Sequence, residues 1–530
     1  MNRPINIYII LLQLLFFAVS LGASADTIPV RNCRPTRPSK SSLKEDFISS
    51  PFKGDRRGSG DRRKAPFVLS PSPLADEVKY IGSRHQLTIL VSFNDQDFMQ
   101  EDPLPVWERI FNEKNYNEQP FCGSVHDYFY DQSYGQFLLT FDLYRIALDE
   151  TRVKYKSTYS DDENSQYLVD DLVDVLLTKD IDWSRYDWDN DGYIDQLLIV
   201  YAGLGMNDGG GSNSIWPHQW WLSLHENLET DDPNDYRSYR TVTQGDKQYI
   251  IDCYCCLNER ASSEDEGTFG TIIHEYSHCF GFPDFYNGST SYVGGWDLMD
   301  RGNYNGDGYC PPSYSAHERM LMGWLQPIEL TQPIAITQME ATSTHPQAYI
   351  IRNSAVDNEF YVLENRQPTK WDSQLPGSGI IVAHVIFDPD VWTWGAANSS
   401  SLKRYTIFPA NNNTSTLSAA DWPYPYQQND SLTNLSAPAA TLYYDNVEGD
   451  KLMSKPIKNM KVENGQASFT FLDADPSSHI EELSTVNSPS GDLEGFLYDL
   501  TGRQIVNGKS VNGKLPRGLY IVNGKKILVK

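Results

Sequence analysis

The sequence predicts an α+β domain, then a β-sandwich and a small β domain, on three observations. The chain has 530 residues, which is too long for one ordinary core. Helix-like and strand-like patterns are mixed up to about residue 328, and short β-rich runs between Pro, Asn, Gly and Ser turns follow. The predicted segments are a signal peptide at 1–25, a pro-segment or flexible lead-in at 26–82, the α+β domain at 83–328, the β-sandwich at 329–473 and the small β domain at 480–530.

The first residues predict export. Arg3 gives a short basic start, an apolar run extends from Ile7 to Leu21, and Ala23-Ser24-Ala25 is a small-residue cleavage site. A membrane anchor is the alternative, but the apolar run is short for a span. We therefore expect a secreted protein, extracellular or attached to the cell surface after signal peptide cleavage, with no membrane span.

The next segment, 26–82, is rich in Pro, Ser, Arg and Lys and has few apolar runs. This composition is typical of a pro-segment, and equally of a flexible linker. Its basic residues leave a net charge of about −33 on residues 65–530, since the whole chain carries −26. A segment with this much negative charge repels nucleic acids and anionic membranes, which argues against both as partners.

The α+β domain is predicted from alternating and helical hydrophobic periods. Strand patterns and helix patterns occur in the order strand 85–93, helices 106–111 and 125–130, strand 136–148, helix 167–178 and strand 193–203. The β-sandwich is predicted from strand patterns at 349–353, 359–366, 379–386 and 467–472. In the tail, Asn523-Gly524 is typical of a two-residue hairpin turn between small antiparallel strands.

The chemistry is concentrated in the run HEYSHCFGFPD at 274–284. His274 and His278 are four residues apart in a helical pattern, so both imidazoles project from one face and can reach one ion. Gly281 can end the helix in a left-handed conformation, and the chain then doubles back. Asp284 arrives six residues after His278, where a three-ligand zinc site needs its third donor. The alternative is two ordinary histidines on a helix.

Glu275 lies between the histidines and is expected to act as a general base. Zinc lowers the pKa of a bound water, and a neighbouring carboxylate can take the proton as the water attacks a peptide carbonyl. Fifteen residues beyond Asp284, the run GGWDLMDRGNY contains Met299, which is the candidate for an apolar Met-turn beneath the metal.

These motifs extend over much of the chain. HEYSHCFGFPDFY, VGGWDLMDRGNYN, DWDNDGYIDQLLIVYAGLG, SIWPHQW, VHDYFYDQSYGQF and ERMLMGWLQP resemble segments of immune inhibitor A-like metallopeptidases, as does LENRQPTKWDSQLPGSGIIVAHV further along. The resemblance implies a zincin or metzincin-like catalytic domain and a secreted zinc endopeptidase, made as a zymogen, that acts on protein substrates. It also implies His274 and His278 as ligands and Glu275 as the base. Asp284 fits the third ligand by spacing, while a more distant carboxylate stays open.

A second metal site is predicted at the start of the 193–203 strand. Oxygens at positions 1, 3, 5, 7 and 9 of a calcium loop would come from Asp187, Asp189, Asp191, the Tyr193 carbonyl and Asp195. Leu198 stands where such a loop has its bidentate Glu, so another group would have to complete the shell. An acidic turn without calcium is the alternative. We expect a structural Ca²⁺.

Seven cysteines leave at least one thiol without a partner in the chain. The cluster Cys253, Cys255 and Cys256 has no second pair at zinc-ribbon spacing, which favours disulfide or buried-thiol roles. Cys33, among arginines, is a candidate latency thiol that would cap zinc in the precursor, although a disulfide is equally consistent.

The tail contains YDLTGRQI and LPRGLY and resembles sorting domains of the bacterial type IX secretion system, which makes that machinery an expected partner. A small accessory β domain is the alternative. Two other functions stay open for the whole chain. One is a binding or adhesion protein with an inactive peptidase fold, and the other is a metal hydrolase of a different substrate.

Overall fold

The computed structural model describes residues 80–157, 164–225, 238–261, 265–266, 269–393, 395 and 397–473, together with five strands between residues 484 and 529. In this part of the chain, no helix is long and apolar enough to cross a membrane. The signal peptide, Cys33 and the lead-in up to residue 79 lie outside the described residues, and the first strand begins at Gly82, the last residue of the expected lead-in.

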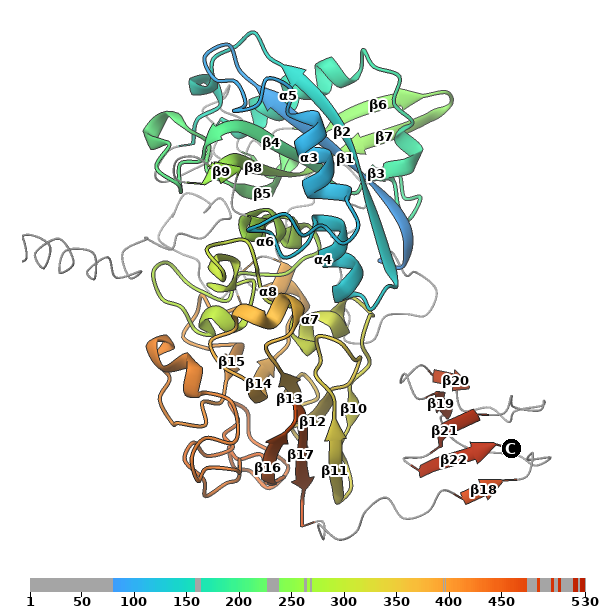
Figure 1. The fold of residues 1–530 in the computed structure, drawn as a ribbon, viewed down its shortest axis with the longest axis vertical. Coiled ribbons are helices and arrows are strands. Elements are labelled where there is room, and N and C mark those ends of the chain that lie inside the picture. Colours follow the sequence, from blue (N-terminus) through green and yellow to red (C-terminus); the bar gives the residue numbers. More distant parts are fainter. Residues whose placement is uncertain are drawn as a thin grey trace, which may run out of the picture.

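A six-stranded sheet organises the first half of the described chain (Figure 1). Its order is β2-β1-β4-β8-β5, and β9 pairs with β8. The strands are β1 Gly82–Ser92, β2 Phe137–Ala147, β4 Leu197–Leu204, β5 His218–Trp221, β8 Cys253–Ala261 and β9 Asp265–Glu266. Strands β2, β1, β4 and β8 pair in parallel, whereas β5 and β9 pair with β8 antiparallel.

Helices cover both faces of this sheet. In β1, Leu87, Ile89 and Val91 point into a core that they share with α5 (Ser165–Leu176). Leu90 points the other way, into the core that contains the helices α3, α4 and α6, whose bounds are Leu104–Asn112, Val125–Gln132 and Phe269–Cys279. Burial by helices on both faces explains why the second half of β1, from Leu87 to Val91, is apolar except for Thr88.

The mixed α and β class expected for this half is confirmed, and so are the helices and strands expected before residue 180. The strand expected at 193–203 is wrong in one respect, because it is two strands. Tyr193–Ile194 forms β3, which belongs to a separate sheet of order β3-β7-β6 with β6 Arg240–Gln244 and β7 Lys247–Ile251. The break lies at Asp195 and Gln196, and the Asp195 carboxylate accepts from Trp188 N at 2.6 Å.

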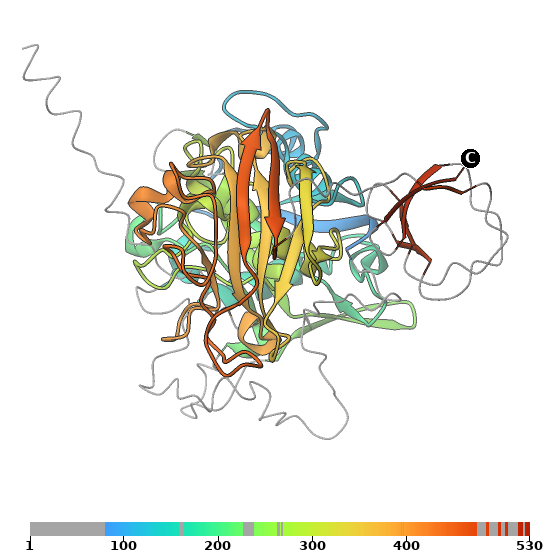
Figure 2. The ribbon, with the colours of Figure 1, turned by 90° about the horizontal axis from the view of Figure 1, so that it is seen from below.

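Two further sheets occupy residues 328–471. The larger has the order β10-β12-β13-β14-β15, and the smaller has the order β11-β17-β16. Their bounds are β10 Ile328–Glu329, β12 Tyr349–Arg352, β13 Glu359–Arg366, β14 Gly379–Ile386, β15 Tyr405–Ile407, β11 Ile334–Met339, β16 Ile457–Glu463 and β17 Gln466–Phe471. Figure 2 views the molecule from this end and shows the three strands of the smaller sheet side by side.

The larger sheet is buried on both faces. In β13, Tyr361 and Leu363 belong to the core shared with the smaller sheet. The alternate residues Phe360 and Val362 belong to the same core as α6. The hydrophobic core therefore continues through the domain boundary expected at 328, and a separate β-sandwich from 329 to 473 stays a prediction. The short helix α7 (Ala316–Leu321) precedes this boundary, and the short helix α8 (Pro389–Thr393) follows β14.

The tail forms a sheet of order β18-β22-β21-β19-β20. Its strands are β18 Ser484–Val486, β19 Leu497–Asp499, β20 Gln504–Val506, β21 Gly518–Val522 and β22 Lys525–Val529. β21 and β22 pair antiparallel with Val522 opposite Lys525, although the expected turn at Asn523-Gly524 itself lies outside the described residues. The antiparallel strands expected in the tail are confirmed for the pairs β19–β20, β19–β21 and β21–β22. β18, which precedes the residues of that prediction, pairs with β22 in parallel.

Candidate metal centre

Helix α6 carries His274, Glu275 and His278, and every residue of this helix is buried. α6 lies between the six-stranded sheet and the segment that follows the helix, and it contacts β8 and β5 of that sheet (Figure 1). Gly270 allows the close approach of the next loop, because a Cβ there would meet the Asn303 carbonyl oxygen at 1.9 Å. The first turn of the helix is thereby held against the segment that follows the candidate Met-turn.

The helix ends as its sequence predicts. Gly281 has a φ of +87°, in the left-handed region that favours glycine. Gly281 N donates to His278 O at 2.9 Å and Phe282 N donates to Ser277 O at 3.4 Å, which together form a Schellman motif. This ending reverses the chain and brings Asp284 back over the helix.

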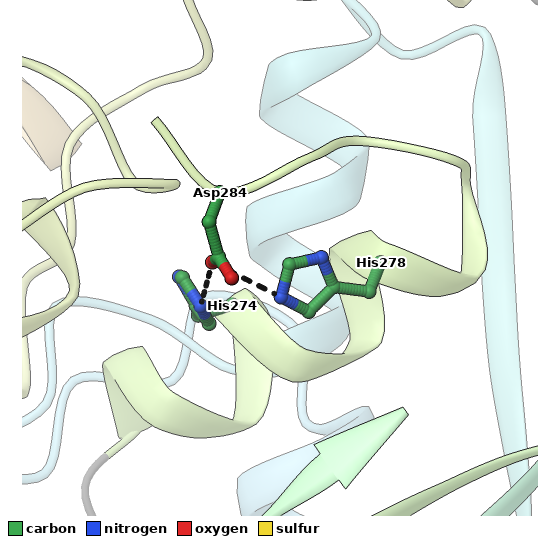
Figure 3. Close-up of side chains that lie close together, drawn as sticks. All are labelled: His274, His278 and Asp284. Carbon is green, nitrogen blue, oxygen red and sulfur yellow. Dashed lines mark ion pairs between the residues drawn. The ribbon is translucent and has the colours of Figure 1, made fainter. Parts of the chain in front are cut away.

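The three predicted ligand residues converge (Figure 3). Asp284 Oδ1 lies 3.2 Å from His274 Nε2 and 3.3 Å from His278 Nε2. All three side chains are buried, and one donor atom from each lies within 4.8 Å of the others. Two imidazole nitrogens and one carboxylate oxygen are a donor set that suits Zn²⁺, and three protein ligands leave a fourth position for water or substrate.

Backbone carbonyls fix the tautomer of both histidines. His274 Nδ1 lies 2.8 Å from Leu298 O, and His278 Nδ1 lies 2.7 Å from Phe282 O. A carbonyl oxygen only accepts, so each Nδ1 must carry the proton. Each Nε2 then presents its lone pair to the point where the three residues meet. Metal-binding histidines usually donate their other ring nitrogen in this way.

The charges at this point are strongly coupled. Burial alone would lower the pKa of His274, but the hydrogen bond to Asp284 and the charge of Glu275 outweigh it and raise that pKa to about 9. Burial would raise the pKa of Asp284, but the two histidines lower it below its ordinary range. The two carboxylates therefore favour a positive charge between the imidazoles, which a proton or a metal ion can supply.

Met299 is buried in the core, in a tight turn. Asp297 closes the turn, since its carboxylate accepts from Met299 N at 2.9 Å and its carbonyl accepts from Gly302 N at 2.9 Å. Met299 O accepts from Phe285 N at 2.8 Å, next to Asp284. The Leu298 carbonyl thus orients the His274 ring, and the next carbonyl, that of Met299, fixes the backbone beside Asp284.

The sequence predicts a role for the Met299 side chain, but it does not predict this role of the backbone carbonyls at 298 and 299. The signal that could have shown it is Asp297, two residues before Met299, because an Asp side chain often closes a local turn by accepting a backbone N–H two residues on.

The acidic loop brings together three of its four predicted carboxylate ligands. Carboxylate oxygens of Asp187, Asp189 and Asp191 lie within 4.8 Å of one another. The Asp187 carboxylate also accepts from Asp191 N at 3.0 Å and from Gly192 N at 3.1 Å, which closes the loop. Asp195 is outside this group, and one of its oxygens accepts from Trp188 N. Tyr193 pairs with Ile250 through β3.

Among the cysteines that the structure describes, Cys122 and Cys310 form a disulfide. The other four, Cys253, Cys255, Cys256 and Cys279, are buried thiols. Of the two roles expected for the 253–256 cluster, a disulfide or a buried thiol, the structure shows the buried thiol.

The first half of the chain matches a known family. Residues 82–324 match the family model described as Immune inhibitor A peptidase M6, catalytic domain, which confirms the resemblance carried by the motifs in that range. Immune inhibitor A of Bacillus thuringiensis subsp. alesti is 28% identical over 176 residues, which are 29% of this chain and 24% of that protein. Pre-pro-metalloprotease PrtV of Vibrio cholerae serotype O1 (strain M66-2) is 27% identical over 187 residues, which are 31% of this chain and 19% of that protein. The matched part thus spans about a quarter or less of these relatives.

Proposed function

We propose that this chain, whose residues 82–324 match the peptidase M6 catalytic domain, is a secreted zinc-dependent endopeptidase that hydrolyses peptide bonds of proteins. The observation that carries the proposal is the convergence of His274, His278 and Asp284, with both histidine tautomers fixed so that Nε2 faces the carboxylate. The names of the relatives support it, since one is called a metalloprotease.

His274, His278 and Asp284 would hold the ion, and Glu275 would be the general base. A zinc ion bound here would act as a Lewis acid and would lower the pKa of the water bound to it. Glu275 follows His274 on the buried helix, and its charge acts on the His274 ring, so its carboxylate is close to the centre. We propose that it takes the proton of the attacking water and returns that proton to the leaving nitrogen. The Met299 turn would hold His274 and Asp284 in place during this exchange.

Two other functions are distinguishable by experiment. A binding protein with an inactive peptidase fold would have no use for a carboxylate at Glu275, so the presence of all four residues favours an enzyme. A hydrolase acting on another class of substrate would leave proteins intact. Digestion of casein or gelatin by the processed protein separates both alternatives from the endopeptidase.

Metal removal is the first test. We expect dialysis against a zinc chelator to abolish casein hydrolysis, because the water loses the ion that lowers its pKa, and stoichiometric Zn²⁺ to restore it. The measurement is casein hydrolysis together with bound zinc per chain. Proteolysis that persists in fully zinc-free protein would exclude the mechanism.

Calcium in the acidic loop is a second proposal, supported by the closed loop around Asp187 and the proximity of three carboxylates. We expect Ca²⁺ to raise the melting temperature, because an ion that binds only the folded state stabilises it by mass action. Asp189→Asn should remove most of that rise, whereas Asp246→Asn, at an exposed position between β6 and β7, should keep it. A melting temperature that is insensitive to Ca²⁺ in the unsubstituted protein rejects the proposal.

Export and maturation stay part of the proposal. The signal peptide at 1–25, the latency thiol Cys33 and all but the last three residues of the pro-segment at 26–82 lie outside the described residues. The name Pre-pro-metalloprotease supports a leader and a pro-segment in such proteins. The five-stranded tail is consistent with a sorting domain for type IX secretion, and retention of the protein in cells that lack that machinery would test this role.

A further inference from the structure

Strand β13 ends in a buried charged residue outside the matched range 82–324. Arg366, the last residue of β13, has only 2% of its side chain exposed. Burial alone would lower its pKa, but the charges of Asp372 and Glu364 outweigh this, and the pKa of Arg366 lies above its ordinary value. A fully desolvated guanidinium is costly unless its donors are satisfied, so its partners are informative.

The guanidinium joins three segments of the chain. It donates to both carboxylate oxygens of Asp372, at 3.0 Å and 2.9 Å. It also donates to Ser313 O at 3.1 Å and to Trp296 O at 3.4 Å. Asp372 in turn accepts from Ser313 N at 2.8 Å. The planar fork of an arginine suits such a multiple contact, which a lysine ammonium cannot reproduce.

The contact at Trp296 leads directly to the metal centre. Trp296 is followed by Asp297, which closes the turn whose Leu298 carbonyl orients His274. Burial raises the pKa of Asp297 to about 7, and the nearby Arg366 charge acts to lower it. Arg366 therefore supports this turn through a backbone hydrogen bond and through the charge that it places beside Asp297.

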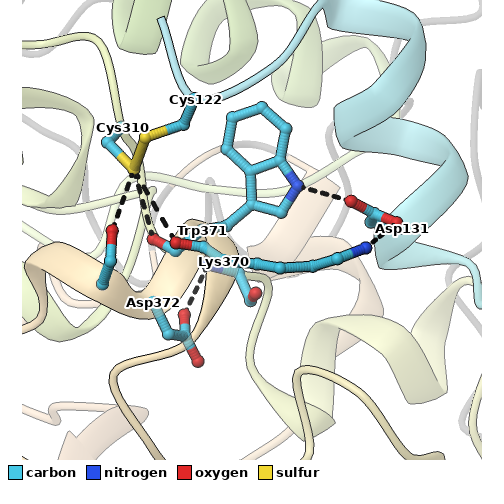
Figure 4. The surroundings of a disulfide bond; sticks show 8 residues. Cys122, Asp131, Cys310, Lys370, Trp371 and Asp372 are labelled. Atoms are coloured by element: carbon cyan, nitrogen blue, oxygen red, sulfur yellow. Dashed lines mark hydrogen bonds and ion pairs between the residues drawn. A yellow bond between two sulfur atoms is a disulfide. The ribbon is translucent and has the colours of Figure 1, made fainter. Parts of the chain in front are cut away.

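The same loop also contacts the beginning of α6. The Trp371 ring stacks on Phe269, the first residue of α6, with ring centroids 5.7 Å apart and planes 4° apart. Trp371 Nε1 donates to Asp131 at 2.9 Å, and the Cys122–Cys310 disulfide lies beside this loop (Figure 4). Residues 366–372 thus contact both the start of the metal-binding helix and the turn that orients its first histidine.

We propose that Arg366 and Asp372 are positioning residues of the metal centre, so that the sheet beyond residue 328 is required for zinc affinity. The inference rests on the proposed function, because it assumes that His274, His278 and Asp284 bind zinc. Neither residue would contact the ion. Both act through the backbone at 296–299.

The test compares zinc affinity in three full-length variants. Arg366→Lys keeps the positive charge but loses the planar set of donors of the guanidinium. The double variant Arg366→Met with Asp372→Asn removes both charges of the pair. Arg352→Lys is the matched control, because Arg352 lies on β12 of the same sheet, is 27% exposed and pairs with Glu329. Zinc dissociation constants come from competition with a chromophoric chelator. The visible absorption of the Co²⁺-loaded protein reports ligand geometry, and urea unfolding of the zinc-free protein reports stability.

We expect both Arg366 variants to bind zinc about 10- to 100-fold more weakly, as is usual when a group that orients a ligand is lost. Their Co²⁺ bands should shift, while KM for a peptide at saturating zinc stays unchanged. Arg352→Lys should match the unsubstituted protein in every measurement.

Unchanged zinc affinity and an unchanged Co²⁺ spectrum in the Arg366 variants would overturn the inference. Unfolding of both variants regardless of zinc would also overturn it, since the pair would then support the fold as a whole. Absence of zinc binding in the unsubstituted protein would instead reject the proposed function, so the two failures are distinguishable.

Discussion

Replacement of Glu275 by Gln is expected to lower peptide hydrolysis by about 10²- to 10⁴-fold while zinc remains bound. The substitution keeps the size of the side chain and removes its ability to take a proton. The three ligand residues are untouched, and the histidine tautomers are fixed by the carbonyls of Leu298 and Phe282, which do not depend on Glu275. Zinc binding should therefore persist, weakened only by the loss of the Glu275 charge that favours a cation between the imidazoles, while proton transfer from the water is lost.

The measurement is kcat for a fluorogenic peptide, with bound zinc quantified on the same sample. Glu463→Gln, an exposed position on β16, controls for loss of a carboxylate elsewhere. A Glu275→Gln protein that loses zinc would assign Glu275 to the metal rather than to proton transfer. Full activity with zinc bound would remove Glu275 from the mechanism.

Replacement of Asp284 by Ala is expected to weaken zinc binding by more than about 100-fold, because even groups that only orient a ligand are worth about 10- to 100-fold. Asp284 Oδ1 approaches both Nε2 atoms within 3.3 Å, so its loss leaves two imidazoles alone in a buried site. Casein hydrolysis should fall with zinc content and return in part at high zinc.

Zinc titration monitored by competition with a chelator measures this effect. Asp246→Ala, between β6 and β7, is exposed and should bind zinc like the unsubstituted protein. Near-normal affinity in Asp284→Ala would show that a more distant carboxylate is the third ligand. It would not by itself dismiss His274 and His278.

The candidate ligands could be predicted because their geometry is local. His274 and His278 are one turn apart on a helix, and the glycine that reverses the chain is read from its position and confirmed by a φ of +87°. Everything needed to place Asp284 lies within eleven consecutive residues. Local hydrogen bonds at the end of the helix bring Asp284 near the two histidines, whereas the orientation of the His274 ring depends on a more distant carbonyl.

The supporting contacts could not be predicted because they join distant segments. The Leu298 carbonyl reaches His274 across 24 positions, and Arg366 reaches the Trp296 carbonyl across 70. A backbone carbonyl has no side-chain signature in the sequence. Arg366 also stands in a strand-like run whose other residues predict only a buried strand.

For the fold, too, local elements could be predicted from the sequence, whereas contacts between distant segments could not. Hydrophobic periods predicted β1, β2 and the helices α3 to α5, but they missed β8 inside the six-stranded sheet. The boundary at 328 does not coincide with a gap in the core either. Phe360 and Val362 on one face of β13 contact a different core from Tyr361 and Leu363 on the other. A run that is apolar on both faces shows that a strand is buried, and it does not show which partners bury it.

The central claim is that His274, His278 and Asp284 share one zinc ion. A crystal structure of the zinc-loaded protein, with anomalous data on both sides of the zinc absorption edge, tests it most directly. The account predicts one zinc peak within about 2.2 Å of both Nε2 atoms and of an Asp284 carboxylate oxygen. A fully active protein whose anomalous map shows no peak between these three groups would contradict it.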